Sequence, residues 1–225
     1  MNDDLFAPNK EFYASDRVVA HYANNTTLSS AEKKILSRYD AHVRQGELLD
    51  VGVGAGRTVP HLRAYAASYT GIDYSQPMID RCSARFPDAR LLCCDVRDLA
   101  PFETASFDTA YAIFNGLDEL PPDDRLRALS EVARVLRPGG LFLFSSHNIG
   151  WRNDVAGDPA IVIERMMGVE LPTYYIGAKA QTSQLAARGF ETIEVSDAGG
   201  EVLTDFAPRN DPWLFYAARR AWTSF

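Results

Sequence analysis

Apolar and polar positions follow two different periods along the chain, and the two periods alternate. Short apolar runs of the kind that form buried strands lie at 46–54, 68–73, 89–95, 107–114 and 140–146. Apolar residues with helical spacing lie before or between them, at 31–43, 75–86 and 123–136. Strands that alternate with helices of this length pair in parallel through right-handed crossovers, so the pattern predicts a doubly wound α/β sheet.

The end of the chain breaks this alternation. Residues 137–140 read RPGG, and they are expected to end a helix and open the next strand, because proline cannot continue a helix. The segments 190–200 and 212–220 are strand-like, and the polar, Pro-containing loop between them leaves no room for a crossover helix. We expect them to pair antiparallel. The prediction is a Rossmann-like, seven-stranded, mostly parallel sheet with helices on both faces and its last strand antiparallel.

Two regions lie outside the alternation. Residues 1–45 are expected to form an N-terminal helical cap, and residues 149–180 an insert between the fifth and sixth strands, here called the lid insert. Ligands of open α/β sheets bind beyond the carboxyl ends of the strands, so we expect the cap and the lid insert to form the substrate site. The whole chain, 1–225, is expected to be a single domain.

A glycine-rich segment follows the first strand. Gly52, Gly54 and Gly56 lack a Cβ, which allows a sharp turn and a close approach to a ligand. Asp73 ends the next strand, where its carboxylate can accept hydrogen bonds from two ribose hydroxyls. Together these features predict a nucleoside ligand. The GxGxG spacing differs from the GxGxxG of dinucleotide sites, and no YxxxK signature follows the fourth strand, so NAD is disfavoured.

Five segments carry a resemblance to a known family. LLDVGVGAGRT, GIDYSQPMI, CCDVRDL, SFDTAYAIFN and RVLRPGGLFLFSS resemble, in order and spacing, the motifs of class I S-adenosylmethionine-dependent methyltransferases of the small-molecule type. The resemblance covers residues 46–148, and the final strand pair extends it to the end of the chain. It implies S-adenosylmethionine as the cofactor and S-adenosylhomocysteine as its product.

The resemblance also implies cofactor contacts around the glycines. Gly52, Gly54 and Gly56 line the methionine part and the ribose, Asp50 lies near the ammonium group, and Asp73 binds the ribose hydroxyls.

Further contacts are implied on the adenine side. Tyr74 packs against the adenine, Asp95 accepts from its amino group, and the Val96 amide reaches a ring nitrogen. Met78 is a further contact. The alternative for Tyr74 and Met78 is that they cover the first turn of a helix.

Three other segments complete the predicted site. The backbone of Phe114 and Asn115 is expected to touch the cofactor ammonium group. Tyr13 and Tyr22 resemble the N-terminal tyrosines that close over the cofactor in small-molecule methyltransferases, and a tyrosine suits a gate that faces both substrate and water. The alternative is that these tyrosines only attach the N-terminal segment to the core.

Methyl transfer from a sulfonium is an in-line displacement with an activated leaving group, so the protein mainly positions the acceptor and excludes water. The candidate catalytic residues are Asn115, which could orient the acceptor, His147, which could take a proton, and Tyr22. The structural alternatives are an Asn-Gly turn and a hydrogen-bonded strand-end histidine. No metal is required.

Charge and composition limit the partners. The chain has 225 residues and a formal net charge of -7, which disfavours nucleic acid. No apolar run is long enough for a membrane helix and the N-terminus does not resemble a signal peptide, so we expect a cytoplasmic protein. The expected partner is a small-molecule acceptor methylated on N, O or C, and the expected state is a monomer or homodimer. Non-methylating chemistry such as cyclisation, or methylation of a protein, stays open as an alternative.

Overall fold

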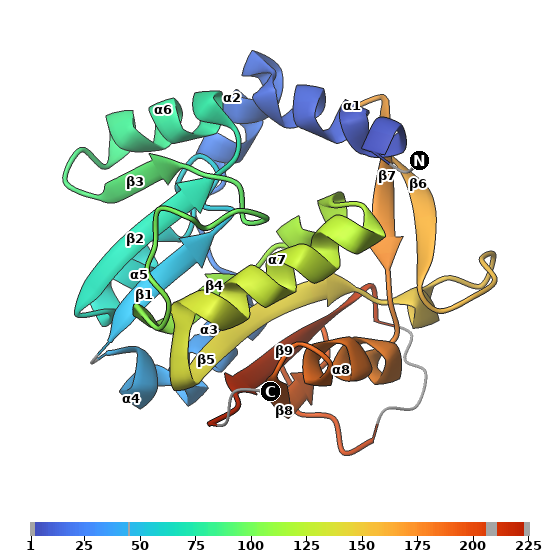
Figure 1. The fold of residues 1–225 in the computed structure, drawn as a ribbon. Coiled ribbons are helices and arrows are strands. Elements are labelled where there is room, and N and C mark those ends of the chain that lie inside the picture. Colours follow the sequence, from blue (N-terminus) through green and yellow to red (C-terminus); the bar gives the residue numbers. More distant parts are fainter. Residues whose placement is uncertain (1–2, 45, 206–210, 223–225) are drawn as a thin grey trace.

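The computed structural model describes residues 3–44, 46–205 and 211–222, and Figure 1 shows its fold. Its main sheet has the strand order β3-β2-β1-β4-β5-β9-β8. Strands β1 to β5 pair in parallel, and β9 runs antiparallel to both β5 and β8. The predicted fold is confirmed. The strands of this sheet are β1 (Glu47–Val51), β2 (Ser68–Asp73), β3 (Arg90–Cys93), β4 (Phe107–Ala112), β5 (Leu136–His147), β8 (Phe190–Ser196) and β9 (Trp213–Arg220).

Helices cover both faces of this sheet, which explains why its central strands are continuous apolar runs. Successive side chains of a strand point to opposite faces. Leu49 and Phe142 therefore join one hydrophobic cluster, whereas their neighbours Leu48 and Leu143 join another. The covering helices are α5 (Val59–Tyr65), α6 (Gln76–Arg85), α7 (Pro122–Val135) and α8 (Ala178–Ala186).

The described part of the N-terminal cap is helical, and it consists of short helices. The predicted helix at 31–43 is divided at Tyr39, which ends α3 with a non-helical ψ of 12°. Ser29 and Glu32 form a reciprocal capping box that starts α3. The helices of the cap are α1 (Asp3–Ala14), α2 (Asp16–Asn24), α3 (Ser30–Arg38) and α4 (Asp40–Val43). None of the described helices is long and apolar enough to span a membrane.

The lid insert contains a β-hairpin that sequence analysis did not predict. Strands β6 (Ala160–Met166) and β7 (Val169–Tyr175) form their own two-stranded antiparallel sheet. The hairpin lies beside α1 at one end of the main sheet (Figure 1), and Asn9 Nδ2 donates to Pro172 O across a distance of 3.0 Å. Helix α8 begins at Ala178, within the last three residues of the predicted insert.

The RPGG segment lies inside β5 instead of before it. Helix α7 ends at Val135 and β5 begins at Leu136. The pairing of β4 with β5 shifts register between Phe107 and Thr109, so the extra residues form an irregularity in the strand. In the predicted loop before β9, residues 206–210 lie outside the described residues.

A buried ion pair joins four elements next to the carboxyl end of β5. Arg125 of α7 donates from Nε to Asp118 Oδ1 over 3.3 Å, and both side chains are fully buried. Asp118 belongs to the 3-10 helix η1 (Gly116–Glu119). Arg125 also donates to Ser146 of β5 and to Gln181 of α8. The pair therefore sets how η1, α7, β5 and α8 pack.

We predict that Arg125→Met lowers the free energy of unfolding by about 3–5 kcal/mol, because it removes the guanidinium that pairs with the fully buried Asp118 carboxylate. The matched control is Arg165→Met, whose 3.6 Å pair with Glu170 is exposed; its expected effect is below about 0.5 kcal/mol. Urea unfolding measures both. Equal, small effects would mean that the buried pair does not hold the four elements together.

Candidate functional site

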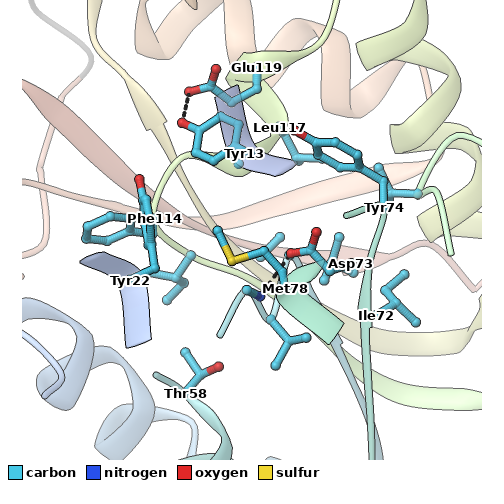
Figure 2. Close-up of a pocket in the computed structure, with 18 of the residues that line it drawn as sticks. Tyr13, Tyr22, Thr58, Ile72, Asp73, Tyr74, Met78, Phe114, Leu117 and Glu119 are labelled. Carbon is cyan, nitrogen blue, oxygen red and sulfur yellow. Dashed lines mark hydrogen bonds between the residues drawn. The ribbon is translucent and has the colours of Figure 1, made fainter. Parts of the chain in front are cut away.

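A cavity lies beyond the carboxyl ends of β1, β2 and β4, below the cap helices α1 and α2. Figure 2 shows Tyr22 and Phe114 on one side of it and Tyr74 on the other, with Asp73 and Met78 between them. The predicted cofactor residues that line this cavity are Tyr13, Tyr22, Gly52, Gly54, Asp73, Tyr74, Met78, Asp95, Val96 and Phe114.

The glycine turn presents bare backbone to the cavity. Gly52 has a φ of +73° and Gly54 a φ of +54°, which side-chain-bearing residues rarely adopt. A Cβ built on either residue would meet nothing within 4 Å, so the space beside both is open. A ligand can therefore approach the backbone closely at this turn.

Asp73 ends β2 at the wall of the same cavity. Its two carboxylate oxygens accept from the backbone N–H groups of Ser75 and Gly54, each at 2.9 Å. Burial raises the pKa of Asp73 to about 6, although both hydrogen bonds favour the charged form. The side chain is thus fixed, and further hydroxyl donors would stabilise its charge.

The carboxylate of Asp95 is held by a neighbour that sequence analysis missed. Arg97 donates to it from its backbone N–H at 2.9 Å, from Nε at 3.0 Å and from Nη2 at 2.6 Å. Burial alone would raise the pKa of Asp95, but these hydrogen bonds and the guanidinium charge lower it. Asp95 is therefore an ionised acceptor at the cavity wall.

Asp50 and Gly56 were predicted to contact the cofactor, but neither lines the cavity. Asp50 lies beneath the glycine turn, where Thr58 Oγ1 donates to it at 2.5 Å and Tyr69 OH at 2.7 Å. A Cβ on Gly56 would come within 2.7 Å of the Phe86 ring, so this glycine allows α6 to pack closely. Both residues support the turn from behind.

Asn115 and His147 lie together outside the cavity lining. Asn115 adopts a left-handed φ of +61°, and its Nδ2 lies 3.3 Å from His147 Nε2. His147 donates from Nδ1 to Asp118 Oδ2 over 3.0 Å, and its backbone N–H donates to the same oxygen over 2.6 Å. A neutral His147 in this arrangement carries its proton on Nδ1, and its unprotonated Nε2 accepts from Asn115 Nδ2.

The charge around His147 favours its protonated form. Burial alone would lower the pKa of His147, but the hydrogen bond and charge of Asp118 raise it above its usual value, with smaller contributions from Glu119 and Glu164. Asp118 was not predicted as a site residue. Asp118 is fully buried. Its place in η1, which turns back after β4, brings its carboxylate next to His147.

Aromatic rings and one carboxyl close the cavity on the cap side. Tyr22 lies edge-on to Phe114, with ring centroids 6.1 Å apart, and Tyr13 OH donates to Glu119 Oε1 at 3.1 Å (Figure 2). Glu119 lines the cavity and was missed. Burial raises its pKa to about 7, against the hydrogen bond from Tyr13.

Comparison with known proteins identifies a methyltransferase domain within the chain. A family model described as a methyltransferase domain matches residues 49–144. A phosphatidylethanolamine N-methyltransferase of Cereibacter sphaeroides is 37% identical over 118 residues, 49% of this chain and 56% of that protein. An O-methyltransferase of Penicillium expansum is 31% identical over 165 residues, 68% of this chain and 55% of that protein. The chain spans about half the length of these curated relatives.

Solved structures show the same fold at low identity. The 1,6-didemethyltoxoflavin-N1-methyltransferase of Burkholderia thailandensis, crystallised with S-adenosylhomocysteine, has a TM-score of 0.68 at 18% identity and covers 96% of this chain and 87% of its own. The cyclase SpnF has a TM-score of 0.61 at 21% identity, over 84% of this chain and 81% of its own. Residues 49–144 thus match a methyltransferase domain, and the chain has the fold of class I S-adenosylmethionine-dependent methyltransferases.

Glu119 is predicted to make the stability of the ligand-free protein depend on pH. Its pKa is raised to about 7 in the folded protein, against about 4.3 in an unfolded chain. The folded state therefore holds this proton more tightly, and the resulting stabilisation is lost as the pH rises through about 7. Between about pH 5.5 and about pH 8, wild type should lose about 2 kcal/mol relative to Glu119→Gln.

Urea unfolding of the two proteins at both pH values measures this difference. An identical pH dependence would contradict the raised pKa of Glu119.

Proposed function

We propose that this protein transfers a methyl group from S-adenosylmethionine to an N, O or C nucleophile of a small-molecule acceptor. The observation that carries the proposal is the pairing of Asp73 with the open glycine turn. A fixed carboxylate and two glycines without steric obstruction line one cavity, in the family of the matching domain.

The lining residues fit the parts of this cofactor. Asp73 and the backbone of Gly52 and Gly54 would hold the ribose and the methionine part, and Tyr74 and Asp95 would hold the adenine. When bound, S-adenosylmethionine supplies an activated methyl group, so the protein needs no metal to make the leaving group reactive.

The chain's own contribution is to orient the acceptor and exclude water. Tyr13 and Tyr22 of the cap and Phe114 after β4 line the cavity together, and they would shield its contents from solvent. Asn115 would orient the acceptor from beside this wall. We further propose that residues 1–225 act as one cytoplasmic domain in which the cap (1–45) and the lid insert (149–180) complete the acceptor site.

His147 would remove the proton of an acceptor hydroxyl or amine. As the new bond to carbon forms, this proton would pass to Nε2 in place of the hydrogen bond from Asn115 Nδ2, and Asp118 would stabilise the resulting imidazolium. Asp118 is a positioning residue in this scheme. The relatives do not narrow the acceptor further, since one is named as an N-methyltransferase and another as an O-methyltransferase.

A second candidate is non-methylating chemistry in the same cavity. It is favoured by one observation, the likeness in fold to the cyclase SpnF. A cyclisation has no methyl acceptor and would give a product of unchanged mass, so product mass separates the two candidates.

The cofactor assignment predicts binding that depends on Asp73. Wild type should bind S-adenosylhomocysteine with a micromolar dissociation constant and should not bind NAD. Asp73→Ala should weaken binding about 100-fold, because two hydrogen bonds to a charged group are lost. Asp80→Ala is the control, since Asp80 is an exposed residue of α6.

Titration calorimetry measures these affinities, and it also tests the protonation state. Because the pKa of Asp73 is about 6, affinity at about pH 5 should be about tenfold weaker than at neutral pH. NAD binding without S-adenosylhomocysteine binding would contradict the proposal.

The role of His147 predicts an acidic limb in the pH profile of kcat/KM for a hydroxyl or amine acceptor. Activity should fall as the pH drops below the raised pKa of His147, because the protonated ring cannot accept a proton. His147→Gln should lower kcat/KM at least about 100-fold and remove this limb. The control, His42→Gln, changes an exposed histidine of α4. A limb that persists in His147→Gln would assign it to another group.

A further inference from the structure

Arg57 is the one cationic side chain among the described residues that line the cavity. It follows the glycine turn directly and is 8% exposed. Its guanidinium lies 4.7 Å from the centre of the Phe114 ring. Its position in the sequence did not identify it as a site residue. A buried cation at the wall of a ligand cavity needs an anionic partner, and the cap supplies one in Glu32.

Glu32 of α3 pairs with one edge of the guanidinium. Arg57 donates from Nη1 to Glu32 Oε2 at 2.9 Å and from Nη2 to Oε1 at 2.6 Å. Nη1 also donates to Thr27 O at 3.2 Å. Glu32 is itself fixed, because Ser29 N–H donates to its Oε2 at 2.6 Å in the capping box. Arg57 is therefore held rigidly by residues of the cap.

This arrangement leaves a second edge of the guanidinium unused. Arginine has five N–H donors, and the hydrogen bonds to Glu32 and Thr27 occupy three of them. The remaining two are on Nε and Nη2, and they form the side edge whose parallel N–H groups match a carboxylate. Nε is not among the described buried atoms that lack a partner, so it faces accessible space.

The charges of the other lining residues direct an anion to this edge. The remaining ionisable acids of the cavity, Asp73, Asp95 and Glu119, would repel a carboxylate. An anionic group of a bound ligand is therefore favoured next to Arg57, close to the glycine turn.

We propose that Arg57, oriented by Glu32, binds the carboxylate of the amino-acid part of the cofactor through its Nε–Nη2 edge. The inference rests on the proposed function and deepens it: the cavity would select nucleosides that keep a free carboxylate. It also makes the cap part of the cofactor site, because Glu32 belongs to α3.

The test compares two ligands that differ only in the carboxylate, S-adenosylmethionine and decarboxylated S-adenosylmethionine, by titration calorimetry. A lost bidentate contact to a charged group is expected to cost a factor of about 100 in affinity. Wild type should therefore prefer S-adenosylmethionine by about 100-fold. Arg57→Met should reduce this preference to less than about threefold, and its affinity for the decarboxylated ligand should equal that of wild type. Arg57→Lys keeps the positive charge but loses the two parallel N–H groups of the guanidinium, so it should retain a preference of about tenfold.

Two further variants separate binding from folding. Arg57→Met leaves Glu32 buried and unpaired, so Arg57→Met/Glu32→Gln provides a version without that charge, and it should show the same loss of preference. Arg63→Met, on the exposed side of α5, should keep the wild-type preference.

Three outcomes would overturn the inference. Equal affinities of wild type for the two ligands would exclude recognition of the carboxylate. Arg57 would have only a structural role if Arg57→Met and Arg57→Met/Glu32→Gln kept the wild-type preference. The same would follow if these variants bound both ligands more weakly by an equal factor. Binding of neither ligand by folded wild type would instead refute the proposed function itself.

Discussion

The hydrogen bond from Gly54 N–H to the Asp73 carboxylate is the contact on which the cavity depends. It joins the turn after β1 to the end of β2 over 2.9 Å. The turn can approach the carboxylate in this way because Gly52 and Gly54 adopt positive φ. Asp50 and Gly56 support the turn from below, through hydrogen bonds and through close packing on α6. The sheet thus provides one rigid wall, with its polar groups already oriented before a ligand arrives.

The opposite wall is attached to the sheet by polar contacts. Tyr13 donates to Glu119, and Arg57 pairs with Glu32. Both contacts connect the N-terminal cap with residues that follow β1 or β4. These four side chains are buried or line the cavity, so the contacts that attach the cap lie at the cavity itself.

The sequence predicted the parts of the site that depend on local spacing. Gly52, Gly54 and Asp73 could be found because a turn after one strand and an acid at the end of the next form a short-range pattern. The role of Gly56 depends on how closely α6 packs, and that of Arg57 on Glu32, 25 positions earlier. Asp118 and Glu119 were missed because the orientation of their side chains depends on the backbone turn before them. Two successive residues with left-handed φ, Phe114 and Asn115, make this turn.

The hairpin of the lid insert could have been predicted. Two strand-like runs flank Met167 and Gly168, which both adopt positive φ, the geometry of a tight two-residue turn. Gly168 was the signal for this turn in the sequence, because glycine readily adopts positive φ.

The most direct test of the account is to incubate the protein with S-adenosylmethionine that carries a trideuteriomethyl group, together with a panel of small hydroxyl and amine compounds. Mass spectrometry of the products follows the label. The account predicts that one acceptor gains an intact trideuteriomethyl group while S-adenosylhomocysteine accumulates in equal amount. A product without the label, formed while the cofactor stays intact, would contradict methyl transfer and favour cyclisation or another non-methylating reaction.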